Sequence, residues 1–200
     1  MENNLFQQVD GGANPTPSLK FLVKKIPNNE AIPFIIKKHY AHRKCSISFA
    51  FGLFKENIIV GVCTFGYPPN QEFNDGACVF GNTIKINTME LNRLFLEDGL
   101  PKNTLSFFVS RALKMLPKPM CIVSYADPNF GHHGYIYQAT NWIYTGVSTP
   151  KFKYTFSDGS SFDIRRGIDK KGVIVGKEKI LPTHRYFKFK GSRASQLAGY

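Results

Sequence analysis

The pattern of hydrophobic and polar positions predicts several short strands. LKFLVKKI and TMELNRLFLED alternate as strands do, and MCIVSYAD is an apolar run typical of a buried strand. SISFAFGLF and IIVGVCTFG are two apolar runs joined by KEN, which predicts a β-hairpin. A second hairpin is expected around Asp158-Gly159, and residues 142–147 are predicted as a further strand. KKGVIVGKEKILPTHRYFKFKG is predicted to close the chain as a loop and a last strand.

Three segments carry helical signals. PNNEAIPFIIKKHYAH is predicted as a helix or helical turn that is interrupted near Pro33. NTLSFFVSRALKMLP has apolar residues at helical spacing, and HHGYIYQATNW is predicted as a short helix. Strands and helices in this order predict an α/β fold, in which a mixed sheet has helices on both faces.

Composition divides the chain into three parts. Residues 1–18, rich in Asn, Gln, Gly and Pro, are expected to form a flexible arm; residues 19–150 are the predicted core, and residues 151–200 a basic, β-rich extension of the same domain. No run approaches the roughly 18 apolar residues of a membrane span, and the first residues lack the plan of a signal peptide. A cytoplasmic protein that does not enter the membrane is therefore expected.

Charge is the strongest global signal. The chain has 26 Lys and Arg against 14 Asp and Glu, a formal net charge of +12. Residues 151–200 contribute 12 basic and 4 acidic side chains, a net +8, whereas residues 1–150 contribute 14 and 10. A polyanion is therefore the expected partner, with the last quarter of the chain as its contact region. A basic surface that only aids solubility is the alternative.

Several sequence blocks resemble a known family. KKHY, ELNRL, PKNTLS, YADPNFGHHGYIYQATNWIYTG and THRYF resemble the phage Mom family of adenine-modifying proteins, and the order of elements resembles the GNAT acyltransferase fold. GNAT enzymes typically have a strand, a phosphate-binding turn, a helix, a strand and then a helix that contains a tyrosine. Tyr137 falls at the position of that tyrosine. The resemblance implies a GNAT-like twisted central sheet, here with a basic C-terminal hairpin extension.

Asp127 and Tyr137 are the leading catalytic candidates. Asp127 ends an apolar strand and precedes Pro128, so we expect it at the carboxyl edge of the sheet, where α/β proteins bind ligands. There it could accept the proton that an adenine 6-amino group loses as it attacks. A turn-forming Asp that caps the following helix is a compatible alternative. The GNAT resemblance implies that Tyr137 protonates a departing thiolate or lines the same pocket; a half-buried helix tyrosine is the alternative.

Arg93 is a third candidate, in the strand ELNRL. Strict alternation places it on the same face as Leu91 and opposite Leu94. A charge among apolar neighbours needs a partner, such as Asp127 or Glu90, or an anionic ligand. The alternative is a purely structural ion pair.

His39 and Tyr40 follow the first predicted helix. The resemblance to the Mom family makes them candidate catalytic residues and candidate ligands of iron. His39 and His42 are three residues apart, which would put two imidazoles on one helix face, although two ligands do not make a metal site. A histidine pair on the surface is the alternative.

The turn before the central helix is the candidate cofactor site. By the GNAT resemblance, Lys102, Asn103, Thr104 and Ser106 would hold the phosphates of acetyl-coenzyme A. GNAT turns usually contain glycines, so that bare amides at the helix N-terminus reach a pyrophosphate. LPKNTLS lacks these glycines, which limits close approach and leaves coenzyme A binding open.

The resemblance implies a transferase that converts adenine in double-stranded DNA to an N6-carbamoylmethyl-type derivative and protects phage DNA from restriction. Such an enzyme must extrude the base. The predicted DNA contacts are Arg165, Arg166, Lys170, Lys171, His184, Arg185 and Tyr186, and the candidate stacking groups are Trp142, Phe130 and Tyr135. Two alternatives stay open: an N-acetyltransferase of a small amine or protein, and a basic DNA-binding or anti-restriction protein without chemistry. The sequence leaves the oligomeric state open, with a dimer as one option.

Overall fold

The computed structural model describes residues 21–69, 87–148, 151–163 and 173–191. Within these ranges the elements follow in the order β1 (Phe21–Lys25), α1 (Asn28–Lys37), β2 (Phe49–Lys55), β3 (Ile58–Gly66), β4 (Thr88–Leu96), α3 (Thr104–Met115), β5 (Met120–Ala126), the 3-10 turn η2 (Pro128–Phe130), α4 (Tyr135–Ala139), β6 (Ile143–Val147), β7 (Lys151–Phe156), β8 (Ser161–Asp163), β9 (Ile174–Ile180) and β10 (His184–Lys190). The predicted arm over residues 1–18 lies outside the described residues. None of the helices described is long and apolar enough to cross a membrane.

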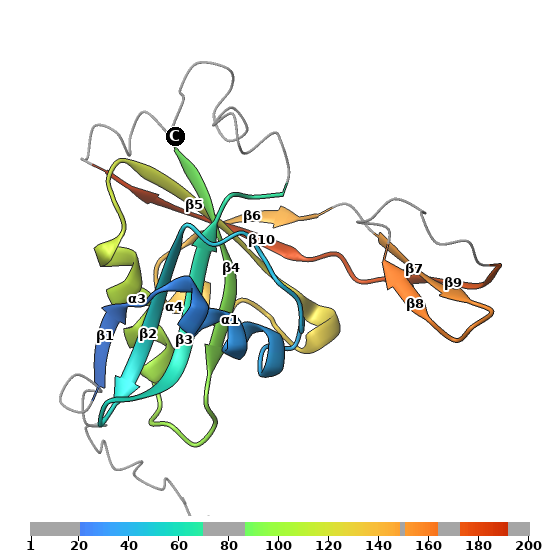
Figure 1. Cartoon of the computed structure of the whole chain (residues 1–200). Coiled ribbons are helices and arrows are strands. Elements are labelled where there is room, and N and C mark those ends of the chain that lie inside the picture. The colour runs from blue at the N-terminus through green and yellow to red at the C-terminus, as the bar shows by residue number, and fades with distance from the viewer. Residues whose placement is uncertain (1–20, 70–86, 149–150, 164–172, 192–200) are drawn as a thin grey trace, which may run out of the picture.

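Seven strands form the central sheet, in the order β1-β2-β3-β4-β5-β10-β6 (Figure 1). All neighbouring pairs are antiparallel except β4 and β5, which run parallel. The predicted mixed α/β fold is therefore confirmed. The elements from β4 through the turn, α3, β5 and α4 to β6 also follow the order that the GNAT resemblance implied.

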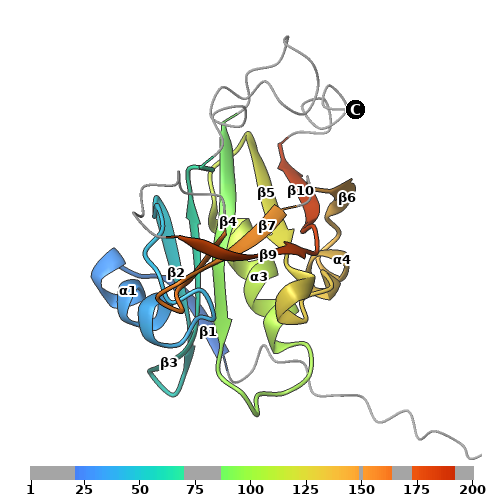
Figure 2. The same cartoon turned by 90° about the vertical axis from the view of Figure 1, so that its right-hand side faces the viewer.

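Helices cover both faces of this sheet, as predicted (Figure 2). Side chains alternate along β2, so Ala50 packs in a cluster with Ile35 of α1 while Phe51 packs in the larger core. That larger core includes Phe108 and Val109 of α3, both fully buried. The two apolar faces of one sheet thus explain why the strands are continuous hydrophobic runs in the sequence.

The hairpin predicted at KEN is confirmed. β2 and β3 pair antiparallel from Phe49↔Phe65 to Lys55↔Ile58. The two residues between them, Glu56 and Asn57, both have positive φ, 51° and 68°, the pattern of a type I′ turn. The local sequence is sufficient to set this turn.

The expected interruption at Pro33 is wrong, because α1 runs unbroken from Asn28 to Lys37. Pro33 removes one backbone donor from the helix interior. The helix nevertheless continues, because Ala31 and Ile35 on either side of the proline are buried against the sheet. Tertiary packing therefore outweighs the local preference.

A second, three-stranded sheet has the order β8-β7-β9 and projects from the body (Figure 1). Its hairpin around Asp158-Gly159 was predicted and is confirmed by the pairing of β7 with β8. The segment predicted as a loop before the last strand instead contains β9, which pairs with β7. The sequence of β9, IVGKEKI, lacks the alternation of a half-buried strand because most of its side chains are exposed.

Candidate functional site

The central sheet opens between its two parallel strands. β4 and β5 pair only from Thr88↔Cys121 to Glu90↔Val123, after which β4 stays paired with β3 and β5 with β10. A cavity of about 360 Å³ lies beyond this point. It is lined by the two residues His39 and Tyr40, the second half of β4, Leu105 of α3, the end of β5 and residues 131–137. Ligands of open α/β sheets commonly bind outside the carboxyl ends of strands, so this cavity is the candidate active site.

Tyr137 is a buried wall of this cavity. Its hydroxyl lies 2.7 Å from Oγ of Ser124, and Ser124 in turn donates to the carbonyl of Leu91 at 2.7 Å. Either hydroxyl can be the donor in the bond between Ser124 and Tyr137. Burial raises the pKa of Tyr137 well above its usual value, although the bond to Ser124 acts the other way. The phenol therefore keeps its proton, as a general acid must before it reacts.

Tyr186 supports Tyr137 from β10. Their rings stack with centroids 4.8 Å apart and an interplanar angle of 30°. Trp142 also contacts Tyr137, edge-on, with ring centroids 5.1 Å apart. Tyr186 and Trp142 are only 3% and 7% exposed, so they serve as packing groups here, and Tyr186 does not reach a DNA phosphate at the surface as predicted. Gly134 makes room for this stack, because a Cβ at this position would overlap the Tyr186 hydroxyl.

Asp127 caps the turn that follows β5. Its Oδ1 accepts hydrogen bonds from the backbone amide of Asn129 at 3.0 Å and from the side-chain Nδ2 of Asn129 at 2.7 Å. The turn-forming interpretation thus describes the observed contacts. Asp127 follows Ala126 at the edge of the cavity but is not itself among the lining residues. The described residues leave its second carboxylate oxygen without a hydrogen bond.

His39 is 4% exposed, and its Nδ1 accepts a hydrogen bond from the backbone amide of Ala41 at 3.1 Å. Burial, together with the nearby Arg93 guanidinium, lowers the pKa of His39 from 6.5 to about 4. The ring is therefore neutral at neutral pH, with its proton on Nε2.

Iron does not fit these residues. The described ranges contain no group of three or more His, Cys, Asp or Glu side chains that would hold a metal ion. A metal on Nε2 of His39 would also move the ring proton to Nδ1, where it would face the N–H of Ala41. The expectation of iron at His39 and Tyr40 is therefore unsupported.

Tyr40 instead joins an aromatic group at the rim of the cavity. Its ring lies 4.3 Å from that of His39, 4.6 Å from Phe130 and 4.8 Å from His132, between centroids. Tyr40 is 40% and Phe130 56% exposed, so both rings present surface to solvent. The sequence did not indicate that residues 39–40 and 130–132 meet.

Arg93 and Leu91 lie on opposite faces of the sheet. A bulge at Asn92 makes Leu91 pair with Phe65 and Arg93 pair with Thr64, so Leu91 joins the same core as its neighbours and Arg93 does not. The prediction that Arg93 shares a face with Leu91 is wrong for this reason. Its Nη1 donates to the Asn92 carbonyl at 2.6 Å, while its buried Nε has no hydrogen-bond partner in the described structure.

The turn before α3 has a geometry suited to an anion. Asn103 adopts the left-handed conformation, with φ 69°, that glycine would otherwise supply. The hydroxyls of Thr104 and Ser106 donate to the carbonyls of Pro101 and Asn103, at 2.6 and 2.9 Å. These hydroxyls and the amide of Thr104, which donates to the Pro101 carbonyl at 3.1 Å, are thus used inside the turn. What the turn offers to a ligand is the amides of Leu105 and Ser106 and the exposed Lys102.

The predicted DNA contacts fall into two groups. Arg165, Arg166, Lys170 and Lys171 lie outside the described residues. His184 and Arg185 bind side chains of β6: Nδ1 of His184 lies 3.1 Å from the Tyr144 hydroxyl, and Nε of Arg185 donates to Oγ1 of Thr145 at 3.0 Å. Both residues are half-buried in the central sheet.

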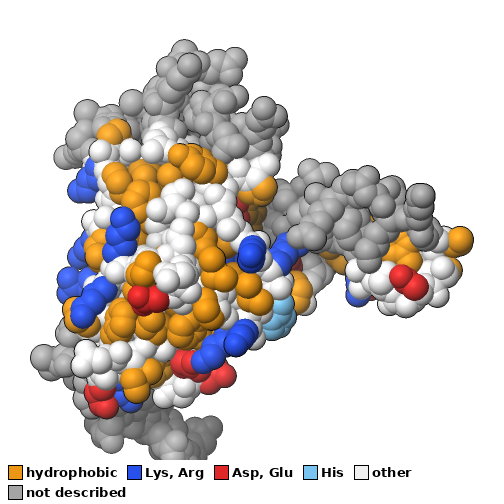
Figure 3. Space-filling model, viewed as in Figure 1, with side chains coloured by type: hydrophobic (Ala, Val, Ile, Leu, Met, Phe, Trp, Pro, Cys, Tyr) orange, Lys and Arg blue, Asp and Glu red, His pale blue; other side chains and the backbone are white. Residues whose placement is uncertain are grey.

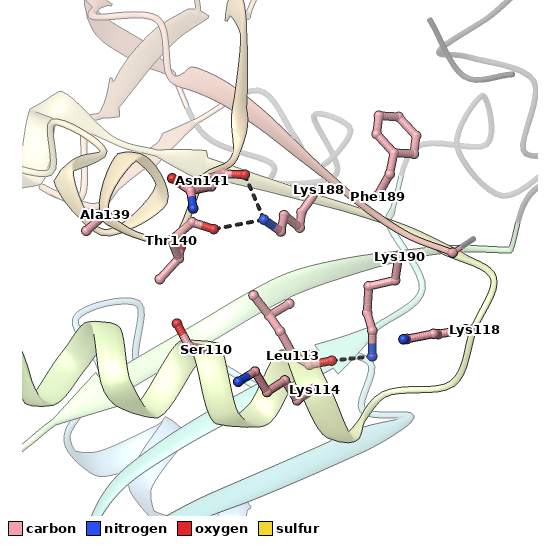
Figure 4. Close-up of a pocket in the computed structure, with 11 residues that line it drawn as sticks. Ser110, Leu113, Lys114, Lys118, Ala139, Thr140, Asn141, Lys188, Phe189 and Lys190 are labelled. Carbon is pink, nitrogen blue, oxygen red and sulfur yellow. Dashed lines mark hydrogen bonds between the residues drawn. The ribbon is translucent and has the colours of Figure 1, made fainter. Parts of the chain in front are cut away.

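A second hollow, of about 630 Å³, lies at the C-terminal ends of α3 and α4 (Figure 4). Lys188 donates to the carbonyls of Thr140 and Asn141 at 3.0 and 2.8 Å. Lys190 donates to the carbonyls of Leu113 and Leu116 at the end of α3. These two lysines bind carbonyls at the C-terminal ends of α3 and α4 and so connect β10 to both helices. The hollow is therefore interpreted as a structural junction.

Comparison with known proteins confirms the resemblance to the Mom family. The ribosomal-protein-S5-alanine acetyltransferase from Vibrio fischeri aligns with 85% of this chain over 93% of its own length, with a TM-score of 0.49 and 12% identity. A GNAT-family acetyltransferase from Bacillus cereus aligns with 85% of this chain over 97% of its own length, with a TM-score of 0.47 and 13% identity. The methylcarbamoylase Mom of Escherichia phage Mu is 33% identical over 174 residues, which cover 78% of this chain and 70% of that protein. The model of the Mom protein family matches residues 20–191. The chain therefore belongs to the Mom protein family.

Proposed function

We propose that the protein is a transferase that modifies the 6-amino group of adenine in double-stranded DNA to an N6-carbamoylmethyl-type group and so protects phage DNA from restriction. Membership of the Mom family and the name of the phage Mu relative, a methylcarbamoylase, support the reaction class. The net charge of +12 supports DNA as the partner. The observation that carries the proposal is the cavity at the opening between β4 and β5, with Tyr137 in its wall.

The acceptor base would bind at the rim formed by Tyr40 and Phe130. An extruded base loses its stacking at a cost of a few kcal/mol. Stacking on an aromatic ring returns about 1–3 kcal/mol per base. The exposed rings of Tyr40 and Phe130, 4.6 Å apart, can provide that contact beside the cavity.

Asp127 would act on the proton of the attacking amine. The 6-amino lone pair is delocalised into the adenine ring, so attack requires that a proton leaves as the new bond forms. Oδ1 of Asp127 is held by Asn129, and this fixes the carboxylate so that its second oxygen can accept that proton. Tyr137 would keep its proton in the cavity and donate it to the departing thiolate.

Acetyl-coenzyme A is the proposed donor, with its phosphates at Lys102 and at the amides that begin α3. When bound, it would supply a two-carbon group as a thioester. Simple acyl transfer joins N6 to the carbonyl carbon and gives N6-acetyladenine. A carbamoylmethyl group is instead joined through its methylene carbon and contains an amide nitrogen that the acetyl group does not supply. Making it from acetyl-coenzyme A would replace a C–H bond of the methyl group by the bond to N6, so that route needs a two-electron oxidant as well as a separate nitrogen source, with the thiol of coenzyme A as leaving group when the amide forms. The product therefore distinguishes this route from plain acyl transfer.

The test is to express the protein in a bacterium, digest the DNA and identify the nucleosides by mass spectrometry. We expect N6-carbamoylmethyl-type adenine. N6-acetyladenine would indicate plain acyl transfer, and unmodified adenine alone, from soluble and folded protein, would contradict the proposal.

Asp127→Asn tests the proposed base. The amide oxygen can still cap the turn but cannot take up a proton, so we expect loss of modification from a folded protein. Asp158→Asn is a matched control, because Oδ1 of Asp158 accepts from the backbone amide of Ser160 at 2.8 Å in the same kind of turn. A protein that protects DNA without chemistry would keep its protection in both variants.

A further inference from the structure

The three-stranded sheet β8-β7-β9, here called the arm and distinct from the N-terminal arm predicted over residues 1–18, projects from the body (Figure 1). It shares no strand pairing with the seven-stranded sheet among the described residues. Figure 1 shows it beside the body, and Figure 2 looks along it toward the body. A projecting sheet of this kind has to be stabilised by its own side chains and leaves much of its surface open to a partner.

One face of the arm combines aromatic rings with lysines. The cross-strand pairs Phe152↔Lys179 and Tyr154↔Lys177 put these four side chains on the same face. Nζ of Lys177 lies 4.2 Å from the ring centroid of Phe152 and 5.8 Å from that of Tyr154. The rings are half-buried, while Lys177 and Lys179 are exposed. The ammonium group of Lys177 thus lies over the Phe152 ring in a cation–π contact, while the lysine side chain stays exposed to solvent.

The opposite face of the arm is different. There Lys153 pairs directly with Glu178 across the strands, so a positive charge is matched by a negative one. The face with Lys177 and Lys179 has two cations and no acidic residue at the paired positions of β7 and β9. Positive charge without local compensation is therefore concentrated on one side of the arm.

The body does not offer an equivalent on the side seen in Figure 3. There the Lys and Arg side chains lie in separate places, with hydrophobic side chains between them. Lys38 of the body forms an ion pair with Glu97. This distribution does not match the continuous charge of a DNA strand.

We infer that the face of the arm with Phe152, Tyr154, Lys177 and Lys179 binds the phosphate backbone of double-stranded DNA. This inference rests on the proposed function, in which DNA is the substrate. Lys177 and Lys179 lie at alternate positions of β9, so both side chains point to the same side and can contact phosphates together. Because the rings are half-buried beneath Lys177, the face contacts phosphates rather than stacking on bases.

The root of the arm leads directly to the candidate active site. Leu181, the residue after β9, exchanges two hydrogen bonds with the side chain of Asn129, which also binds Asp127. DNA held by the arm would therefore be anchored next to the loop that carries Asp127 and Phe130. The arm contributes affinity that does not depend on sequence, while the cavity selects the base.

The test is the salt dependence of binding to a duplex, measured by fluorescence anisotropy. Each lost phosphate contact lowers the slope of log K against log salt by about 0.9, so the double variant Lys177→Ala, Lys179→Ala is expected to lower it by about 1.8. Affinity should fall by the same factor on unrelated sequences. Lys153→Ala, on the opposite face, is the matched control and should leave the slope unchanged.

A second double variant, Lys177→Arg with Lys179→Arg, keeps the charges and should keep the slope; this separates loss of charge from misfolding of the arm. An unchanged slope in the alanine double variant, or an equal fall in Lys153→Ala, would overturn the inference. If the alanine double variant binds DNA like the wild type, and the wild-type protein modifies adenine, the inference about the arm is contradicted but the proposed function is not. Wild-type protein with no affinity for DNA contradicts the proposed function as well.

Discussion

The side chain of Asn129 pairs with both backbone groups of Leu181. Its Nδ2 donates to the carbonyl of Leu181 at 2.9 Å, and its Oδ1 accepts from the amide of Leu181 at 3.1 Å. The same Nδ2 donates to Oδ1 of Asp127 at 2.7 Å. One amide therefore joins the candidate catalytic loop to the root of the arm, across 52 residues of sequence.

Asn129→Ala should loosen this junction. Each net hydrogen bond contributes about 1 kcal/mol, so losing the three side-chain bonds should lower the free energy of unfolding by roughly 2–3 kcal/mol. Hydrogen exchange of the Leu181 amide should become faster, and adenine modification should fall because Asp127 keeps only one of its two hydrogen bonds, the one from the backbone amide of residue 129. The exposed Gln138→Ala serves as a control. Unchanged exchange at Leu181 would show that the junction does not depend on Asn129.

Two glycines near the cavity form a matched pair for substitution. Gly131 and Gly134 both have positive φ, 72° and 81°. At Gly131 a Cβ would meet nothing within 4 Å, so Gly131→Ala should cost only about 1 kcal/mol of backbone strain. At Gly134 a Cβ would overlap Tyr186, so Gly134→Ala should add about 1–3 kcal/mol of overpacking. Thermal unfolding of the two variants measures the difference, and equal midpoints would show that the stack on Tyr137 adjusts freely.

The features that the sequence predicted well are local. The turn at Glu56 and Asn57 follows from residues that tolerate positive φ between two apolar runs. Asp127 before Pro128 predicted both a strand end and a capped turn, and the structure has both. In each case, neighbouring residues determine the conformation.

The features that were missed depend on contacts between distant segments. The bulge at Asn92 arises where β4 meets β3, and Nδ2 of Asn92 donates to the Ser46 carbonyl while its Oδ1 accepts from Thr64. Alternation within β4 alone cannot reveal that one residue is extra, so it assigned Leu91 to the wrong face. Likewise, the contact of Tyr40 with Phe130 depends on how α1 and β5 end at one edge of the sheet.

Tyr137→Phe separates the hydroxyl from the ring. The stack on Tyr186 should remain, and loss of the bond to Ser124 should cost about 1 kcal/mol of stability at neutral pH. Adenine modification should fall sharply if Tyr137 supplies a proton to the leaving group. The measurements are denaturant unfolding and nucleoside mass spectrometry. Full activity in Tyr137→Phe would remove the phenol from the proposed mechanism.

Tyr137→Phe should also change how the free energy of unfolding depends on pH under alkaline conditions. Because the pKa of Tyr137 is higher in the folded protein than in the unfolded chain, its contribution is fully present below about pH 10 and is lost as pH rises further. Tyr137→Phe has no such group, so the difference in unfolding free energy between the two proteins should shrink above pH 10. A constant difference would contradict the raised pKa.

His39 is expected to lower the free energy of unfolding at acid pH, whereas Tyr137 lowers it at alkaline pH. Burial lowers its pKa to about 4 in the folded protein, whereas the unfolded chain has the ordinary value of 6.5. Between these values the unfolded chain binds more protons, so the stability contributed by neutral His39 is present above pH 6.5 and is lost as pH falls toward 4. His39→Gln should therefore flatten the decline of unfolding free energy in this window, while the exposed His133→Gln should leave it unchanged. Urea unfolding at a series of pH values measures both, and a slope in His39→Gln equal to that of the wild type would assign the acid sensitivity to other groups.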